Sequence, residues 1–183
     1  MSNLKFTLKA WPVIAVATIG LCFLTKTISG WFGIEIPDQL NVELVRQWGL
    51  HCFDSLRNFG IFALLLAQVV VLLPAVEELI FRWLLFKLPV RFVEKRLETI
   101  DAKQGHSESV RKIQYPVSVV SSAFFSAAHY IAQPFPDAAF IALFFFGIAQ
   151  CWLYRTTERI WCPMLNHALF NITNLVLLFV VPE

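Results

Sequence analysis

Residues 64–83 read LLLAQVVVLLPAVEELIFRW and place two glutamates and an arginine inside one of the most apolar stretches of the chain. A charged side chain at membrane depth costs roughly 2.5–3.5 kcal/mol, so a cluster of charges there needs a role. Glu78 and Arg82 are four residues apart, share one helix face and can neutralise each other. Glu77 is rotated from Glu78 by about 100° and has no partner nearby in the sequence. The unpaired carboxylate of Glu77 is therefore the first candidate for a catalytic group.

The composition indicates an integral membrane protein. Hydrophobic residues make up 57% of the 183 residues and charged residues only 15%, which excludes a soluble domain. This length accommodates about five or six spans of roughly 20 residues. We therefore predict an all-α, polytopic transmembrane helix bundle that forms a single domain over residues 1–183. The net charge of +2 is too small to indicate nucleic acid, and the expected surroundings are the lipid bilayer.

Apolar segments mark the predicted spans, at about 8–25, 58–86, 115–132, 138–154 and 160–181. A signal peptide is the alternative for the first segment, but no small-x-small cleavage site follows before Lys26, so we expect a retained span. Pro74 is acceptable inside the second segment because a neighbouring helix can satisfy the carbonyl that it frees. Residues 41–58 gather apolar side chains on one side, which is typical of an amphipathic helix at the membrane surface.

Positive charge is concentrated in residues 87–114. Because cations accumulate in cytoplasmic loops, we predict that this segment is a cytoplasmic basic loop and that residues 58–181 form the motif-bearing core. The same rule places the C-terminus outside. The direction of the first span stays open, since a helix break at Pro74 would reverse it.

Further polar side chains lie at membrane depth on separate segments. His129 ends the stretch FSAAH, and His167 and Asn171 lie four residues apart in HALFN, so the latter two share a helix face. Ionisable groups inside spans face the bundle interior or a wet cavity. We therefore expect Glu77, His129, His167 and Asn171 to converge on one pocket. Gln150 and Asn174 form a weaker polar pair.

Such a pocket suits the addition of water to a carbonyl group. A glutamate beside an imidazole can hold and deprotonate a water molecule, and a second imidazole with a carboxamide can donate hydrogen bonds to the resulting oxyanion. These groups fit hydrolysis of a peptide or ester without a covalent nucleophile. Each group also has a structural explanation: Glu78 and Arg82 can be a packing salt bridge, and a lone histidine or asparagine can join two helices.

The three motifs together resemble those of the CaaX-protease and bacteriocin-processing (CPBP, or Abi) family of intramembrane endopeptidases. Members of that family carry EExxxR, FxxxH and HxxxN, in this order, on successive helices. The chain reads EELIFR at 77–82, FSAAH at 125–129 and HALFN at 167–171. The resemblance implies an all-helical membrane fold and a glutamate-type peptidase that cleaves a membrane-associated protein or peptide.

The resemblance also implies a role for each matched residue. Glu77 would be the general base that activates water together with His129. His167 and Asn171 would form the oxyanion site, and no cofactor would be needed.

The remaining motif residues would be supporting: Glu78 and Arg82 would orient the first helix and support Glu77, and Phe125 would pack beside them. The substrate class stays open among a prenylated CaaX protein, a bacteriocin leader and a C-terminal sorting tail. The chain is shorter than the larger members, and the expected location is a prokaryotic cytoplasmic membrane.

Other functions also fit the same residues. Glu77, His129 and His167 could form a two-histidine, one-carboxylate zinc set, although the chain has no HExxH motif and Asn171 is an unusual ligand. A cysteine peptidase using Cys162 and His167 is disfavoured because the two lie about 140° apart around a helix. A membrane partner or bacteriocin-immunity protein would use the polar cluster only for stability or recognition.

Overall fold

The computed structural model describes residues 2–33, 40–100, 106–132 and 139–180. The helices in these residues are α1 (Asn3–Trp31), α2 (Leu40–Leu50), α3 (Leu56–Ala67), η1 (Gln68–Leu72), α4 (Leu73–Glu78), η2 (Leu79–Lys87), α5 (Leu88–Ile100), α6 (His106–Ala132), α7 (Ala139–Thr157) and α8 (Trp161–Val180). Those long and apolar enough to cross a membrane are Asn3–Trp31, Leu56–Arg96, Phe140–Thr157 and Trp161–Val180. The predicted fold class, a transmembrane helix bundle, is confirmed.

Helix α6 covers the predicted span at 115–132, but it is not among the stretches with sufficient length and hydropathy. Serines lower its hydropathy, and they are buried in the bundle: Ser118, Ser121, Ser122 and Ser126. The hydroxyl of Ser126 donates to the main-chain oxygen of Phe140 on α7, at 2.6 Å. One polar face of α6 therefore turns inward.

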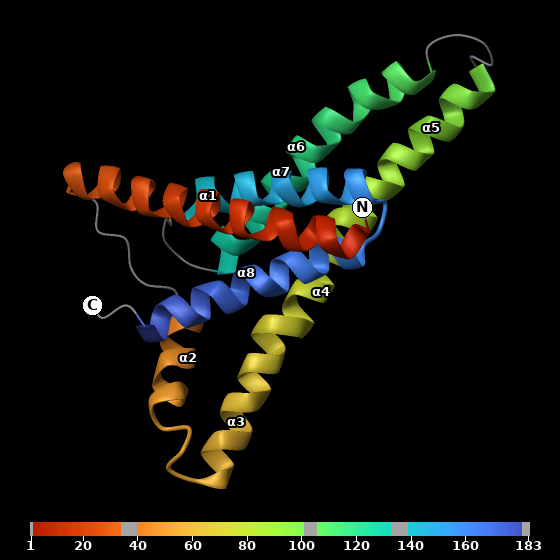
Figure 1. The fold of residues 1–183 in the computed structure, drawn as a ribbon. Coiled ribbons are helices and arrows are strands. Elements are labelled where there is room, and N and C mark those ends of the chain that lie inside the picture. The colour runs from red at the N-terminus through yellow and green to blue at the C-terminus, as the bar shows by residue number, and fades with distance from the viewer. Residues whose placement is uncertain (1, 34–39, 101–105, 133–138, 181–183) are drawn as a thin grey trace.

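The predicted basic loop at 87–114 is wrong over most of its length. Leu88–Ile100 form α5 and α6 begins at His106, while residues 101–105 lie outside the described part of the chain. Helix α5 is amphipathic and rich in Glu, Lys, Arg and Leu, which favour helices. The loop prediction was wrong because it rested on the density of charged residues, and an amphipathic helix can carry the same charges. In Figure 1, α5 and the first turns of α6 form a hairpin that projects from the bundle.

The second predicted span is one continuous helical path with two irregular segments. Helices α3, η1, α4, η2 and α5 follow one another without a break (Figure 1). At the end of η1 the N–H of Leu73 donates to the oxygen of Gln68, five residues back. At the end of η2 the N–H of Leu88 donates to the oxygen of Trp83. Such π-helical turns are rare and frequently occur at functional sites. They flank α4, the short helix that carries both glutamates.

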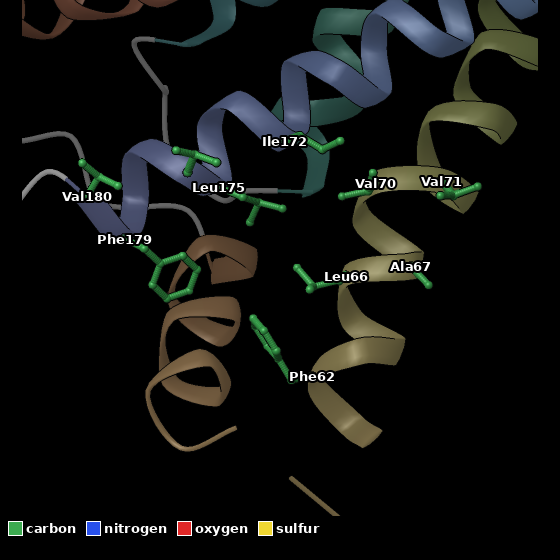
Figure 2. A pocket seen from close by; sticks show the side chains of 10 residues that line it. Phe62, Leu66, Ala67, Val70, Val71, Ile172, Leu175, Phe179 and Val180 are labelled. Atoms are coloured by element: carbon green, nitrogen blue, oxygen red, sulfur yellow. The ribbon is translucent and has the colours of Figure 1, made fainter. Parts of the chain in front are cut away.

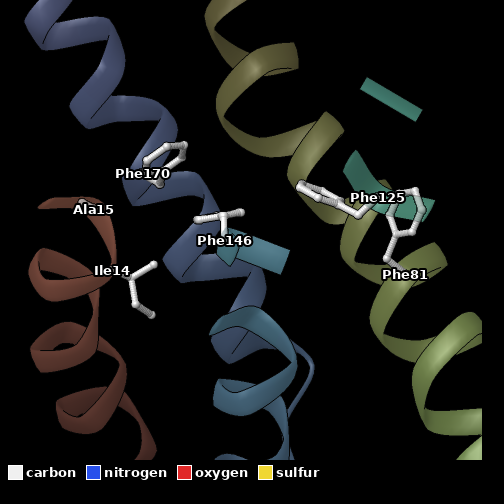
Figure 3. Packing of buried hydrophobic residues seen from close by; sticks show 6 residues of the cluster. All are labelled: Ile14, Ala15, Phe81, Phe125, Phe146 and Phe170. Carbon is white, nitrogen blue, oxygen red and sulfur yellow. The ribbon is translucent and has the colours of Figure 1, made fainter. Parts of the chain in front are cut away.

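The hydrophobic core joins the N-terminal helix to the motif-bearing helices. Helix α1 packs against α7 and α8, α6 packs against α7 and η2, and α8 packs against η1 and α4. Five of these elements contribute to one buried cluster, shown in Figure 3: Ile14, Ala15, Phe81, Phe125, Phe146 and Phe170. Because α1 supplies two of these side chains, it packs as part of the bundle.

Helix α2 forms where an amphipathic helix was predicted, but it ends at Leu50 rather than near residue 58. Val45 is buried, whereas Phe53 lies beyond the helix and is exposed. The apolar side expected for residues 41–58 is therefore shorter than predicted.

Helices α6 and α7 approach each other closely at Gly147. A Cβ atom at this position would lie 2.9 Å from Cβ and Oγ of Ser122 and 3.1 Å from its Cα. These separations leave no room for a side chain, as is common where small residues let membrane helices pack backbone to backbone. Glycine at 147 thus determines how near α6 lies to α7.

Candidate active site

Glu77 lies near the end of α4 and faces two imidazoles from other helices. Its Oε1 is 3.8 Å from Nε2 of His129 on α6, and its Oε2 is 3.6 Å from Nε2 of His167 on α8. Both separations exceed hydrogen-bond range, so the carboxylate stands between the two rings without bonding directly to either. About a quarter of the side chain is exposed, at 23%. The structure thus brings three predicted site residues to one accessible point.

Glu78 points the other way, into the bundle, and is fully buried. Its Oε2 is 3.0 Å from Nε of Arg82, so the ion pair expected from their spacing is present. Its Oε1 accepts a hydrogen bond from Nδ1 of His167 at 3.0 Å. Arg82 is also fully buried, and its guanidinium carbon lies 4.9 Å from the centre of the Phe125 ring. One carboxylate therefore connects the motif on α4 and η2 to the motif on α8.

His129 is held by its own helix. Its Nδ1 lies 2.9 Å from the main-chain oxygen of Phe125, one turn earlier in α6. A carbonyl oxygen can only accept, so Nδ1 carries the hydrogen and Nε2 of the neutral ring keeps its lone pair. That lone pair faces Glu77, which is also an acceptor. A water molecule, with two hydrogens to donate, is the species that satisfies both groups.

His167 sits in a different electrostatic environment. Its Nδ1 donates to Glu78, and its Nε2 faces Glu77, so the ring lies between two carboxylates. Arg82 pairs with one of these two carboxylates. The His167 ring therefore links the buried ion pair of Glu78 and Arg82 to the accessible carboxylate of Glu77.

Aromatic rings fix the two imidazoles. The Phe125 ring is completely buried and lies 4.6 Å from the His129 ring and 5.9 Å from the His167 ring, measured between centroids. Phe146 lies on α7, and the centre of its ring is 5.0 Å from the centre of the His167 ring. Phe125 was predicted as a packing residue of the motif. Phe146 was missed, since an apolar residue in an apolar span carries no distinguishing signal.

Asn171 lies one helical turn after His167 and contacts the glutamate-bearing helical path. Its Nδ2 donates to the main-chain oxygen of Val69 in η1, at 2.8 Å. The prediction that Asn171 shares a face with His167 agrees with this position. Its role at the oxyanion remains a prediction.

Other polar contacts were missed or misassigned. Ser121 on α6 donates to the main-chain oxygen of Phe81 in η2, at 2.5 Å. Gln150 was paired with Asn174, which is wrong: Nε2 of Gln150 donates to Oδ1 of Asn166 at 2.9 Å, and both are buried. Asn174 instead points away from the bundle and is exposed. The position of Asn166 next to His167, on the buried side of α8, could have indicated that Asn166 and not Asn174 is the partner of Gln150.

The residues of the zinc alternative, Glu77, His129 and His167, lie together here, and that alternative stays a prediction. Among the described residues, no group of three or more His, Cys, Asp and Glu side chains is arranged to hold a metal ion.

An apolar pocket of about 590 Å³ lies between α3–η1 and α8 (Figure 2). Its walls include Leu66 and Val70 on one side and Ile172 and Phe179 on the other. All its lining residues are apolar, which suits a hydrocarbon chain rather than a charged group.

The comparisons with known proteins agree with these motifs. The family described as type II CAAX prenyl endopeptidase Rce1-like matches residues 59–173, more than half of the chain. The match includes Glu77, His129, His167 and Asn171. No curated protein and no solved structure matches the chain significantly.

Proposed function

We propose, from the premise that the chain belongs to the Rce1-like type II CAAX prenyl endopeptidase family, that it hydrolyses a peptide bond in a membrane-associated substrate with a water molecule activated by Glu77. The family establishes an intramembrane protease of the CAAX type in an integral membrane protein. The single observation that supports the residue roles is the position of the Glu77 carboxylate, 3.8 Å and 3.6 Å from the two Nε2 atoms.

In the first step a water molecule donates one hydrogen to Glu77 and the other to Nε2 of His129. Glu77 takes the first proton as the water oxygen forms a bond to the carbonyl carbon of the scissile peptide. The π electrons of that carbonyl move to its oxygen, which becomes an oxyanion. General-base catalysis of this type contributes about 10²–10⁴-fold to the rate.

His167 stabilises the oxyanion from the opposite side. Its Nδ1 is held by Glu78 at 3.0 Å, which orients Nε2 toward the reacting atoms. When Glu77 takes the proton from water, Glu77, Glu78, Arg82 and His167 together gain one positive charge at the moment the negative oxyanion forms. This change supplies the electrostatic stabilisation that acyl transfer requires.

The tetrahedral intermediate then collapses. The C–N bond breaks, the proton held by Glu77 passes to the leaving nitrogen, and the products are a carboxylic acid and an amine. Glu77 is again an ionised carboxylate. No metal takes part in these steps.

The substrate is proposed to carry an apolar anchor. The pocket between α3–η1 and α8 supports this, because its lining accepts hydrocarbon and includes Ile172, five positions after His167 on the same helix. The excess of cations on the α5–α6 hairpin supports a cytoplasmic position for that hairpin.

The test is cleavage by the purified full chain in detergent. Four peptides are compared: a prenylated CaaX peptide, the same peptide without its prenyl group, a bacteriocin-type leader and a C-terminally anchored tail. Wild type is expected to cleave at least one of them. Glu77→Gln and His167→Ala are expected to lose about 10²–10⁴-fold in kcat/KM.

Glu94→Gln, which changes a carboxylate on the distant α5, is the matched control and is expected to keep wild-type activity. Folded wild type that cleaves no peptide, or folded Glu77→Gln that cleaves at the wild-type rate, would overturn the proposal. The first outcome would favour a membrane partner or immunity role instead.

A further inference from the structure

Val69 has a main-chain oxygen that its own helix does not satisfy. In a regular α-helix this oxygen would accept from the N–H of Leu73, but that N–H donates to Gln68 instead. In the π-helical register of η1 the donor would be residue 74. Pro74 occupies that position and has no N–H. The carbonyl group of Val69 is therefore left without a backbone donor, which is costly inside a membrane.

Asn171 supplies the missing donor from another helix. Its Nδ2 lies 2.8 Å from the Val69 oxygen, although the two residues are 102 positions apart in the sequence. Pro74 itself is fully buried. A carboxamide has two N–H groups but only one nitrogen, so a bond to Val69 fixes where the whole amide lies.

This hydrogen bond sets the distance between two parts of the candidate site. Asn171 lies one turn after His167 on α8, and Val69 lies two turns before Glu77 on the glutamate-bearing path. The bond therefore prevents α8 from sliding along η1 and α4. Such sliding would change the 3.6 Å separation between Oε2 of Glu77 and Nε2 of His167.

We infer that Asn171 is a positioning residue, which holds the His167 helix in register with Glu77 by satisfying the carbonyl that Pro74 leaves free. The inference deepens the proposed function and rests on it for the activity measurement only. It gives Asn171 a role beyond the motif-based prediction, in which the amide contacts the reacting oxygen.

The decisive experiment is a double-mutant cycle of Asn171→Ala and Pro74→Ala in the full chain. Alanine at 74 restores a backbone N–H, so the Val69 oxygen no longer depends on Asn171. In the wild-type background, Asn171→Ala is expected to lower kcat about 100-fold with little change in KM, since small misplacements of reacting groups have effects of this size. In the Pro74→Ala background, the same change is expected to cost less than about tenfold.

Two matched controls separate this coupling from general effects. Asn174→Ala removes an exposed amide from the next turn of α8 and is expected to leave kcat unchanged. Pro12→Ala removes a proline from inside α1 and is expected to give no rescue of Asn171→Ala. An equal loss from Asn171→Ala in both backgrounds would overturn the inference, because a direct contact with the oxyanion is indifferent to residue 74.

Thermal unfolding of the same four variants in detergent needs no substrate. Asn171→Ala is expected to lower the unfolding midpoint by several degrees in the wild-type background and by much less in the Pro74→Ala background. If wild type cleaves nothing, the proposed function fails while this cycle still decides whether Asn171 serves the Val69 oxygen. Unfolding shifts of Asn171→Ala that are equal in both backgrounds would overturn the inference by themselves.

Discussion

Glu78 and His167 form a buried hydrogen bond of 3.0 Å across 89 positions of sequence. The same carboxylate pairs with Arg82 at 3.0 Å. The second glutamate of the motif is therefore the group that orients the imidazole on α8, while the first glutamate faces the accessible side.

Glu78→Gln is expected to reduce both activity and stability. Glutamine has no charge to balance Arg82, so the guanidinium is left buried and unpaired. Breaking a buried ion pair in this way costs about 3–5 kcal/mol. The unfolding midpoint and kcat of the purified variant measure the two effects.

Glu78→Gln combined with Arg82→Met is the control, because it removes both charges. This double variant is expected to recover most of the stability but not the activity. Recovery of kcat together with stability would show that Glu78 acts only on the fold.

His129→Asn is expected to separate folding from chemistry. An asparagine amide can replace Nδ1 as the donor to the Phe125 oxygen, which His129 contacts at 2.9 Å. It does not reach Glu77, so the water loses its second acceptor and kcat is expected to fall about 100-fold or more. The unfolding midpoint is expected to stay close to that of wild type. A variant with near wild-type kcat would contradict a role for His129 in holding water.

Ser121→Ala is expected to loosen η2 from α6. Its hydroxyl donates to the Phe81 oxygen across the helix interface, and loss of such a buried bond costs about 1–3 kcal/mol. Ser118→Ala is the matched control, since that hydroxyl donates to Gln114 within α6 itself. A larger loss of thermal stability for position 121 than for position 118 is the expected result. Equal losses would argue against the interhelical contact.

Chelation is expected to leave activity intact. The proposed mechanism activates water with Glu77 and His129 and needs no metal, and among the described residues no group of three or more His, Cys, Asp and Glu side chains is arranged to hold one. The check is peptide cleavage after dialysis against EDTA, together with the metal content of the active sample. Activity that disappears on chelation and returns with zinc would support the metal-dependent alternative.

Local patterns predicted much of the fold and part of the candidate site. Apolar runs located the helices, because the membrane requires long apolar segments with internally satisfied backbones. The spacing of Glu78 and Arg82 predicted their ion pair, which is present at 3.0 Å. Intact motifs predicted that Glu77, His129 and His167 converge, and their side chains do meet.

Contacts between distant segments could not be predicted in the same way. The partner of Asn171 is a main-chain oxygen, so no side chain at Val69 marks it among its apolar neighbours. The π-helical turns were also hidden, because a span that is apolar on all sides has no periodicity that reveals its register. Pro74 was the one available signal, since a carbonyl freed by proline has to find a donor on a neighbouring helix.

The size of the residue at position 147 controls the separation between α6 and α7. Because α6 and α7 touch through Ser122 and a residue without a side chain, each added atom at 147 would push α6, and His129 with it, away from α7. A series of glycine, alanine and serine at this one position would thus move a candidate catalytic imidazole in small steps while leaving its chemistry untouched. The activities of these variants would show how activity depends on the distance between Glu77 and His129.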